Sequence, residues 1–163
     1  MLLSSSGTQL IHNAAGADAL YLCSLRNYGA TIVHLAARYP RVAVIGAGTR
    51  GEFREEDQRC CALVADGLVR AGFTVRDETT HMVLDRWRGR SVTDWRESRS
   101  VEYLRRSGQL RDLEFILAHL NDLDRVFAVE EGEVVARRPV SGERHAAAVP
   151  AAALAAACPE GVR

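Results

Sequence analysis

Lysine is absent from this chain of 163 residues, so that all 21 of its basic side chains are arginines. They balance 21 acidic side chains, and the formal net charge is zero. A neutral chain is a poor candidate for broad binding to nucleic acid, although a local arginine patch stays compatible with neutrality. We therefore expect no nucleic-acid partner.

Long apolar runs are also missing from the chain. No run reaches the roughly 20 residues that a helix needs to span a bilayer. The first residues, MLLSSSGTQ, lack the positive start and the long apolar stretch of a signal peptide. We expect a cytoplasmic protein with no membrane contact, and the content of 47% hydrophobic and 26% charged residues is typical of one globular domain.

Cysteines are few, and their spacing is that of neither a metal site nor a disulfide framework. The four are Cys23, Cys60, Cys61 and Cys158. This pattern favours a reducing compartment. Cys60 and Cys61 are predicted to be small core residues of a helix. Cys23, at the end of a predicted strand, is open to two interpretations, a core residue or a nucleophile.

The most informative stretch that is present is VAVIGAGTRGEFREED, residues 42–57. Val42–Ile45 is apolar and partly β-branched, as in a buried strand. Gly46, Gly48 and Gly51 follow, and glycines at the end of a strand allow a sharp turn and a close approach to a ligand. The acidic run 55–57 then begins a helix, where carboxylates are favoured by the helix dipole. Any active site is expected here.

The first 72 residues repeat a unit of strand, small-residue loop and helix three times. The predicted strands are Leu2–Ser5, Ala19–Ser24 and Val42–Ile45, and the predicted helices are Gln9–Ala15, Ala30–Arg38 and Glu55–Ala71. Such units give parallel strands with right-handed crossovers, so we predict a three-layer α/β/α fold with a mainly parallel sheet. The loops around Gly7, Asn27 and Gly48 would then meet at the carboxyl edge of that sheet, where ligands bind.

After residue 72 the chain is predicted to form a helical segment and a C-terminal β-hairpin. The helices are Thr80–Trp87, Thr93–Arg106 and Leu110–Asn121, and the strands are Asp124–Val129 and Glu133–Arg137. Glu131-Gly132 between the strands suits a tight turn. We expect one domain over residues 1–138 and a flexible, Ala-rich tail over 139–163, with a short helix at Ala151–Ala157.

The glycine loop and the acidic run each allow several roles. Residues 46–51 fit the G-x-G-x-x-G pattern of an NAD(P)-binding oxidoreductase, which requires a helix that starts inside the motif. They also fit a simple tight turn. Glu55, Glu56 and Asp57 could cap the helix, pair with Arg59, or hold Mg²⁺, which needs only one or two carboxylates. Residues 4–8 could bind an anion or simply cap a helix.

Three ordered segments resemble the C-terminal half of the 2-phosphosulfolactate phosphatase family. They are LLSSSGTQL, ADALYLCSLRNYGATI and VAVIGAGTRGEFREEDQRCCALVADGL. The family shows an Asn-Gly-Thr turn, a Gly-Ser-Leu-x-Asn loop, and an Ala-Gly strand end followed by Glu-Asp at a helix. The resemblance extends over residues 2 to 137, and it continues through RDLEF and DRVFAVEEGEVV.

The resemblance implies a Mg²⁺-dependent hydrolysis of the phosphate ester of sulfolactate, a step in coenzyme M biosynthesis. It also implies functional positions in each of the three segments. The substrate-binding positions are Gly7, Thr8, Ser24, Asn27, Gly48 and Gly51, and the catalytic and metal-binding ones are Glu56 and Asp57. The implied partner is a small phosphorylated acid.

Two departures from the family pattern bear on activity. Ser6 stands where the family has asparagine, and the family's N-terminal half has no counterpart in the chain. Three interpretations follow: the start of the chain is truncated, the other half is a separate partner chain, or the chain is a reduced and inactive relative. A non-catalytic anion-binding half domain is the alternative function, and a homo-oligomer is a compatible state.

Overall fold

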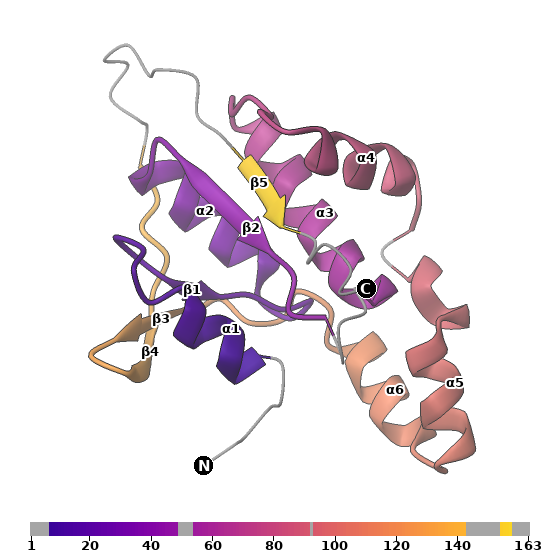
Figure 1. Cartoon of the computed structure of the whole chain (residues 1–163). Helices are drawn as coiled ribbons and strands as arrows, with labels where there is room; N and C mark the ends of the chain where they lie inside the picture. The colour runs from indigo at the N-terminus through magenta and orange to yellow at the C-terminus, as the bar shows by residue number, and fades with distance from the viewer. Residues whose placement is uncertain (1–6, 49–53, 92, 143–153, 158–163) are drawn as a thin grey trace.

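The computed structural model describes residues 7–48, 54–91, 93–142 and 154–157. Helices make up most of the regular structure, and the strands are short (Figure 1). In chain order the elements are α1 (Gly7–Asn13), β1 (Tyr21–Leu22), α2 (Tyr28–Arg38), β2 (Val42–Ile45), α3 (Glu55–Arg70), α4 (Glu78–Trp87), the 3₁₀ helix η1 (Asp94–Glu97), α5 (Arg99–Arg106), α6 (Leu110–Ala118), β3 (Val126–Glu130), β4 (Glu133–Arg137) and β5 (Leu154–Ala157).

The strands form two small sheets. The first is antiparallel, in the order β1-β3-β4, and Tyr21 lies opposite Ala128. Its β3–β4 hairpin closes at Glu131 and Gly132, which both have positive φ, 51° and 84°. This is the backbone of a two-residue turn whose twist matches the flanking strands, so the predicted hairpin is confirmed. The second sheet is the parallel pair β2–β5, in which Val42 lies opposite Leu154.

The predicted three-layer parallel sheet is not confirmed, although the mixture of helices and strands is. The segment Leu2–Ser5 lies outside the described residues. The predicted strand Ala19–Ser24 shortens to β1, and β1 pairs with β3 in the antiparallel sense, not with β2. A sequence pattern indicates that a strand exists, but its partner depends on which edge the rest of the chain can reach.

Two predicted helices were wrong in detail. The predicted helix Thr93–Arg106 is interrupted at Ser98, whose side chain accepts a hydrogen bond of 3.3 Å from the Val101 N–H and so begins α5 anew. Residues 154–157 of the predicted helix Ala151–Ala157 form β5, because pairing with β2 overrides the intrinsic helix preference of alanine.

The long helix α3 ends in a motif that the sequence signals clearly. Gly72 has φ 92°, and its N–H bonds to the Val69 carbonyl while the Phe73 N–H bonds to the Leu68 carbonyl. These paired bonds satisfy the last carbonyls of the helix and turn the chain back over it. Phe73 therefore packs into the core beside Leu68.

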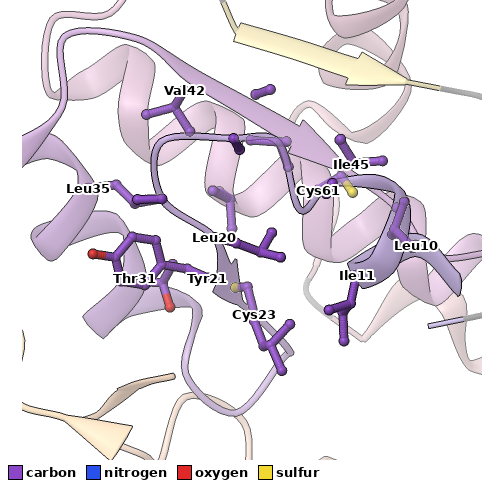
Figure 2. Close-up of a pocket in the computed structure, with 18 of the residues that line it drawn as sticks. Leu10, Ile11, Leu20, Tyr21, Cys23, Thr31, Leu35, Val42, Ile45 and Cys61 are labelled. Carbon is purple, nitrogen blue, oxygen red and sulfur yellow. The ribbon is translucent and has the colours of Figure 1, made fainter. Parts of the chain in front are cut away.

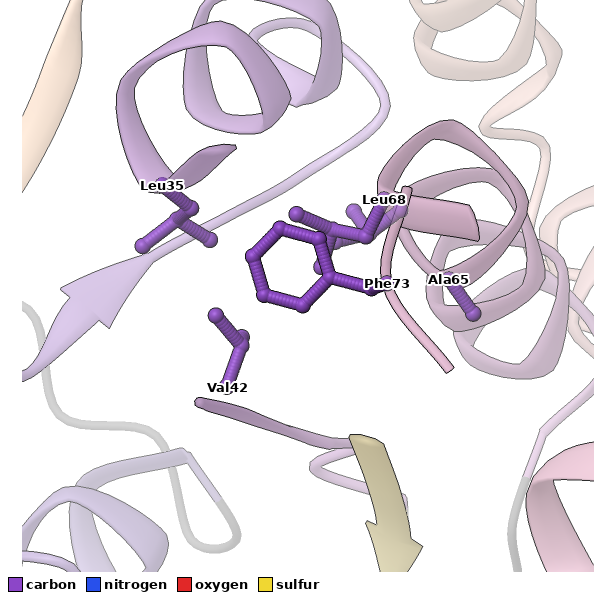
Figure 3. Packing of buried hydrophobic residues seen from close by; sticks show 6 residues of the cluster. Leu35, Val42, Ala65, Leu68 and Phe73 are labelled. Carbon is purple, nitrogen blue, oxygen red and sulfur yellow. The ribbon is translucent and has the colours of Figure 1, made fainter. Parts of the chain in front are cut away.

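Two apolar clusters flank α3. One lies between α2, β2 and the second half of α3 (Figure 3), and its buried members are Leu35, Val42, Val64, Ala65, Leu68 and Phe73. The other joins α3 to α4, α5 and α6, and its buried members are Leu25, Ala62, Val83, Trp87, Val101 and Leu113. Residues of α3 contribute to both clusters, so α3 is the central helix against which α2, α4, α5 and α6 pack. None of the helices in the described part of the chain has both the length and the apolar character that a bilayer-spanning segment needs.

Candidate functional site

The first turn of α3 directs three neighbouring carboxylates to different surroundings. Glu55 pairs with Arg86 of α4 at 3.1 Å. Glu56 accepts a hydrogen bond of 2.5 Å from the Ser100 hydroxyl through Oε1, whereas its Oε2 is buried without a hydrogen-bond partner. Asp57 accepts a hydrogen bond from the backbone of Gly48. Glu55 is thus engaged in an ion pair that links α3 to α4.

The pKa of Asp57 is raised above its ordinary value. Burial is the main cause, and the negative charge of Glu56 adds to it. The Gly48 hydrogen bond and the positive charge of Arg54 act in the opposite direction but do not cancel these effects. Two close carboxylates, one with an unpartnered buried oxygen, form a locally electronegative point that a cation would stabilise.

The loop after β1 approaches these carboxylates and is held by Asn27. The Asn27 Oδ1 accepts hydrogen bonds from the N–H of Ser24 at 2.8 Å and from its hydroxyl at 3.2 Å. Its Nδ2 donates to the Leu22 carbonyl and to the Thr31 hydroxyl, both at 3.2 Å. Asn27 is 1% exposed, so in this structure it shapes the loop that carries Ser24. Its predicted contact with a substrate stays a prediction.

Two cavities meet beside Asp57. The first, of about 660 Å³, is mostly apolar and lies between α1, β1 and β2 (Figure 2). The second, of about 740 Å³, lies between the Ser24 loop, the start of α3 and α5. Asp57, Cys23 and Cys60 contribute to the walls of both. The carboxylate therefore lies at the junction of the two cavities, and more charged side chains line the second cavity than the first.

Three arginines line the second cavity together with Glu56 and Asp57. They are Arg26, Arg54 and Arg99. Arg26 binds Asp122 through two hydrogen bonds, from Nε at 2.8 Å and from Nη2 at 2.6 Å, which ties the Ser24 loop to the segment before β3. The cavity thus combines guanidinium groups, which suit phosphate or sulfonate, with carboxylates, which suit a divalent cation.

The predicted site residues are only partly brought together. Glu56, Asp57 and Ser24 line the second cavity together, and the Gly48 backbone interacts with Asp57. Gly7 begins α1 and lines the first cavity instead, and Thr8 beside it is exposed. Gly51 lies outside the described residues. Substrate contacts of Gly7, Thr8, Ser24 and Gly48 stay predictions.

A metal site here would depend on few protein ligands. Among the described residues, no group of three or more His, Cys, Asp and Glu side chains is arranged to hold a metal ion. Mg²⁺ commonly keeps several waters and binds one or two carboxylates together with oxygens of its substrate. Glu56, with its unpartnered Oε2, and Asp57 meet that requirement.

Sequence reasoning missed the contribution of α5. Ser100 fixes one oxygen of Glu56, and Arg99 lines the same cavity, yet 44 residues separate Ser100 from its partner. Seven arginines lie between Arg86 and Arg106, and nothing in their spacing distinguishes Arg99. Only the approach of α5 to α3 distinguishes Arg99 from the others, and no local pattern predicts that approach.

Comparison of the sequence with known proteins identifies the family of the chain. A sequence profile described as 2-phosphosulpholactate phosphatase matches residues 1–132. A curated relative from Symbiobacterium thermophilum, named probable 2-phosphosulfolactate phosphatase, is 33% identical over 141 residues, which are 83% of this chain and 59% of the relative. The chain thus spans about three fifths of the relative's length. No solved structure matches it significantly. The chain belongs to the 2-phosphosulfolactate phosphatase family.

Proposed function

We propose that the chain carries the metal-binding part of a Mg²⁺-dependent phosphatase that hydrolyses a small acidic phosphate ester, 2-phosphosulfolactate or a close analogue. Family membership supports the reaction class. The observation that carries the proposal is the pair of carboxylates at the start of α3, where Glu56 has a buried unpartnered oxygen beside Asp57.

The roles of the residues follow from their contacts. Ser100 holds one oxygen of Glu56, the other oxygen is buried without a hydrogen-bond partner, and the Gly48 backbone orients Asp57. Arg54 and Arg99 line the cavity where the anionic groups of the substrate would lie. A bound Mg²⁺ would polarise the phosphoryl oxygens and lower the pKa of a coordinated water. A cation would also offset the repulsion between the two carboxylates.

The test is phosphatase activity of the purified chain on 2-phosphosulfolactate and on p-nitrophenyl phosphate, with Mg²⁺ and with EDTA. Activity should require Mg²⁺, and Asp57→Asn should lower it at least about 100-fold, because a metal supplies several kcal/mol of charge stabilisation. Mg²⁺ affinity, measured separately by calorimetry, should fall in the same variant.

Glu55→Gln is the matched control for this experiment. Glu55 lies in the same helical turn but pairs with Arg86, so its loss should leave Mg²⁺ binding nearly unchanged. If the folded chain bound no Mg²⁺ and showed no activity, the proposal that this chain carries the Mg²⁺ site would be wrong.

A second candidate is a subunit-forming half domain that requires another polypeptide. The observation in its favour is the apolar cavity between α1, β1 and β2, whose walls include Leu10, Leu20, Val42 and Ile45 (Figure 2). Such a surface suits packing against further chain. Sedimentation of the purified protein, with and without the remaining part of a longer relative, would distinguish this candidate from an independent enzyme.

The oxidoreductase alternative has weaker support. A dinucleotide site needs a helix that begins within the glycine motif, so that its N-terminus faces the pyrophosphate. Here α3 begins at Glu55 with three acidic residues in its first turn. Negative side chains at that point would repel a pyrophosphate and favour a cation.

A further inference from the structure

Two cysteines from separate elements meet at the junction of the two cavities. Cys23 follows β1, and Cys60 lies on α3 one turn after Asp57. The interaction between the two thiols is the main influence on the pKa of each, and the Cys23 sulfur also lies 3.8 Å from the Ser24 carbonyl oxygen. Both side chains contribute to the walls of both cavities. The Cys23 residue is exposed, and Cys60 is half-buried.

The two thiols have opposite acid–base character. The pKa of Cys23 is lowered, chiefly by the hydrogen bond from Cys60, with smaller effects from Thr31 and the Ser24 backbone, although burial of the sulfur opposes them. The pKa of Cys60 is raised well above its ordinary value by the same hydrogen bond and by burial. Because the thiolate is the nucleophile, Cys23 is the reactive member of the pair.

We propose that Cys23 and Cys60 form a reversible disulfide when the protein meets a hydroperoxide, with Cys23 as the attacking thiol and Cys60 as the resolving thiol. Two cysteines that line the same cavity walls, one of them with a lowered pKa, form the arrangement of a reversible oxidation site. The two belong to different elements, and the bond would link the Ser24 loop covalently to the second turn of α3.

The chemistry needs one molecule of hydroperoxide. The Cys23 thiolate attacks a peroxide oxygen, the O–O bond breaks, and the released hydroxide takes a proton to leave as water, which gives a sulfenic acid on Cys23. The Cys60 sulfur then attacks the Cys23 sulfur, the S–O bond breaks, and the hydroxide leaves as water with the thiol proton of Cys60. Two thiols and one hydrogen peroxide give one disulfide and two waters.

The disulfide would have a local consequence at the carboxylates. Cys23 immediately precedes Ser24, and Cys60 lies three residues after Asp57 on the same helix. Bringing the sulfurs to the bonded separation of about 2.05 Å would draw the loop towards α3 at the place where the cavities join. We expect lower phosphatase activity in the oxidised form. This consequence rests on the proposed function, whereas formation of the bond does not.

The test treats the reduced full-length chain with hydrogen peroxide, blocks remaining thiols with iodoacetamide in denaturant, and measures mass. The oxidised wild type should carry two carbamidomethyl groups, whereas the reduced chain carries four, and its tryptic digest should contain a cross-link between the peptide with Cys23 and the peptide of residues 60–70. Because Cys60 and Cys61 share that peptide, variants assign the bond. Cys61→Ala and Cys158→Ser should keep the cross-link, and Cys60→Ser should abolish it and leave a Cys23 sulfenic acid that dimedone traps.

Alkylation of the native reduced chain gives an independent readout. Cys23 should react with iodoacetamide at pH 7 at least about tenfold faster than Cys60 or Cys61. A bond to Cys61 or Cys158, or no cross-link at stoichiometric peroxide, would overturn the inference. An inactive reduced chain would instead contradict the proposed phosphatase, and the mass measurement would still decide the disulfide.

Discussion

The C-terminal end of α3 and its N-terminal end differ in how completely their side chains are satisfied. At the C-terminal end Leu68 is fully buried beside Phe73 (Figure 3), and the last carbonyls are bonded. At the N-terminal end Glu56 keeps a buried oxygen without a partner, and Asp57 has a raised pKa. Buried polar groups without partners occur in proteins mainly at functional sites. The difference therefore indicates that the C-terminal end of α3 stabilises the fold and that the N-terminal end is the candidate site.

The largest expected effect on stability is at the packed end. Leu68→Ala should lower the free energy of unfolding by about 2–5 kcal/mol, because it removes a fully buried side chain and leaves a cavity. Urea denaturation measures the loss. The matched control is Val69→Ala at the next position, where the side chain is 38% exposed and little change is expected. Equal losses in both variants would contradict the distinction between the two faces.

A smaller loss is expected from Gly67→Ala, on the face of α3 that meets α2. A Cβ at this position would lie 2.5 Å from Cδ1 and 3.0 Å from Cγ1 of Ile32. The helix preference of alanine favours the change by about 1 kcal/mol, but overpacking costs about 1–3 kcal/mol. We expect a net loss of about 1 kcal/mol in urea denaturation.

The double variant Gly67→Ala/Ile32→Val tests the cause of that loss. Valine removes the Cδ1 atom that the new Cβ would meet most closely. The two substitutions together should therefore cost less than the sum of their separate effects. Simple additivity would show that steric contact with Ile32 is not the reason.

The smallest expected effect has the opposite sign and lies at the other end of α3. The folded-state pKa of Asp57 is raised above 3.8, so the folded protein binds that proton more tightly than the unfolded chain. As pH rises through this window, ionisation of Asp57 costs stability, and the cost persists at neutral pH. Asp57→Asn should be slightly more stable than wild type at pH 7, in contrast to the loss expected in the proposed activity.

Urea denaturation at two pH values measures this gain. The advantage of Asp57→Asn should disappear below about pH 3.8, where the wild-type carboxyl is protonated in both states. Glu55→Gln, which removes an ion-paired carboxylate from the same turn, should give no such gain. If Asp57→Asn were less stable than wild type at pH 7, the conclusion that the ionised Asp57 carboxylate lowers stability would be wrong.

Local sequence patterns were sufficient to predict most helices and strands, and they also predicted that the candidate carboxylates begin a helix. The predicted strand Val42–Ile45 and the predicted helix start at Glu55 both match the structure. The hairpin at Glu131-Gly132 does so as well. These features depend on periodicity, turn chemistry and helix ends, which act over a few residues. Family resemblance was likewise visible in the order of short motifs.

What the sequence by itself determined is therefore the set of elements, the family and the acidic start of α3. Only the tertiary structure decided that β1 pairs with β3, that Ser100 holds Glu56, and that the Cys23 thiol meets Cys60. Each of these contacts joins segments at least 37 residues apart. The energy of such a contact exists only after the chain has folded, because it depends on which surfaces the packing of the helices brings together.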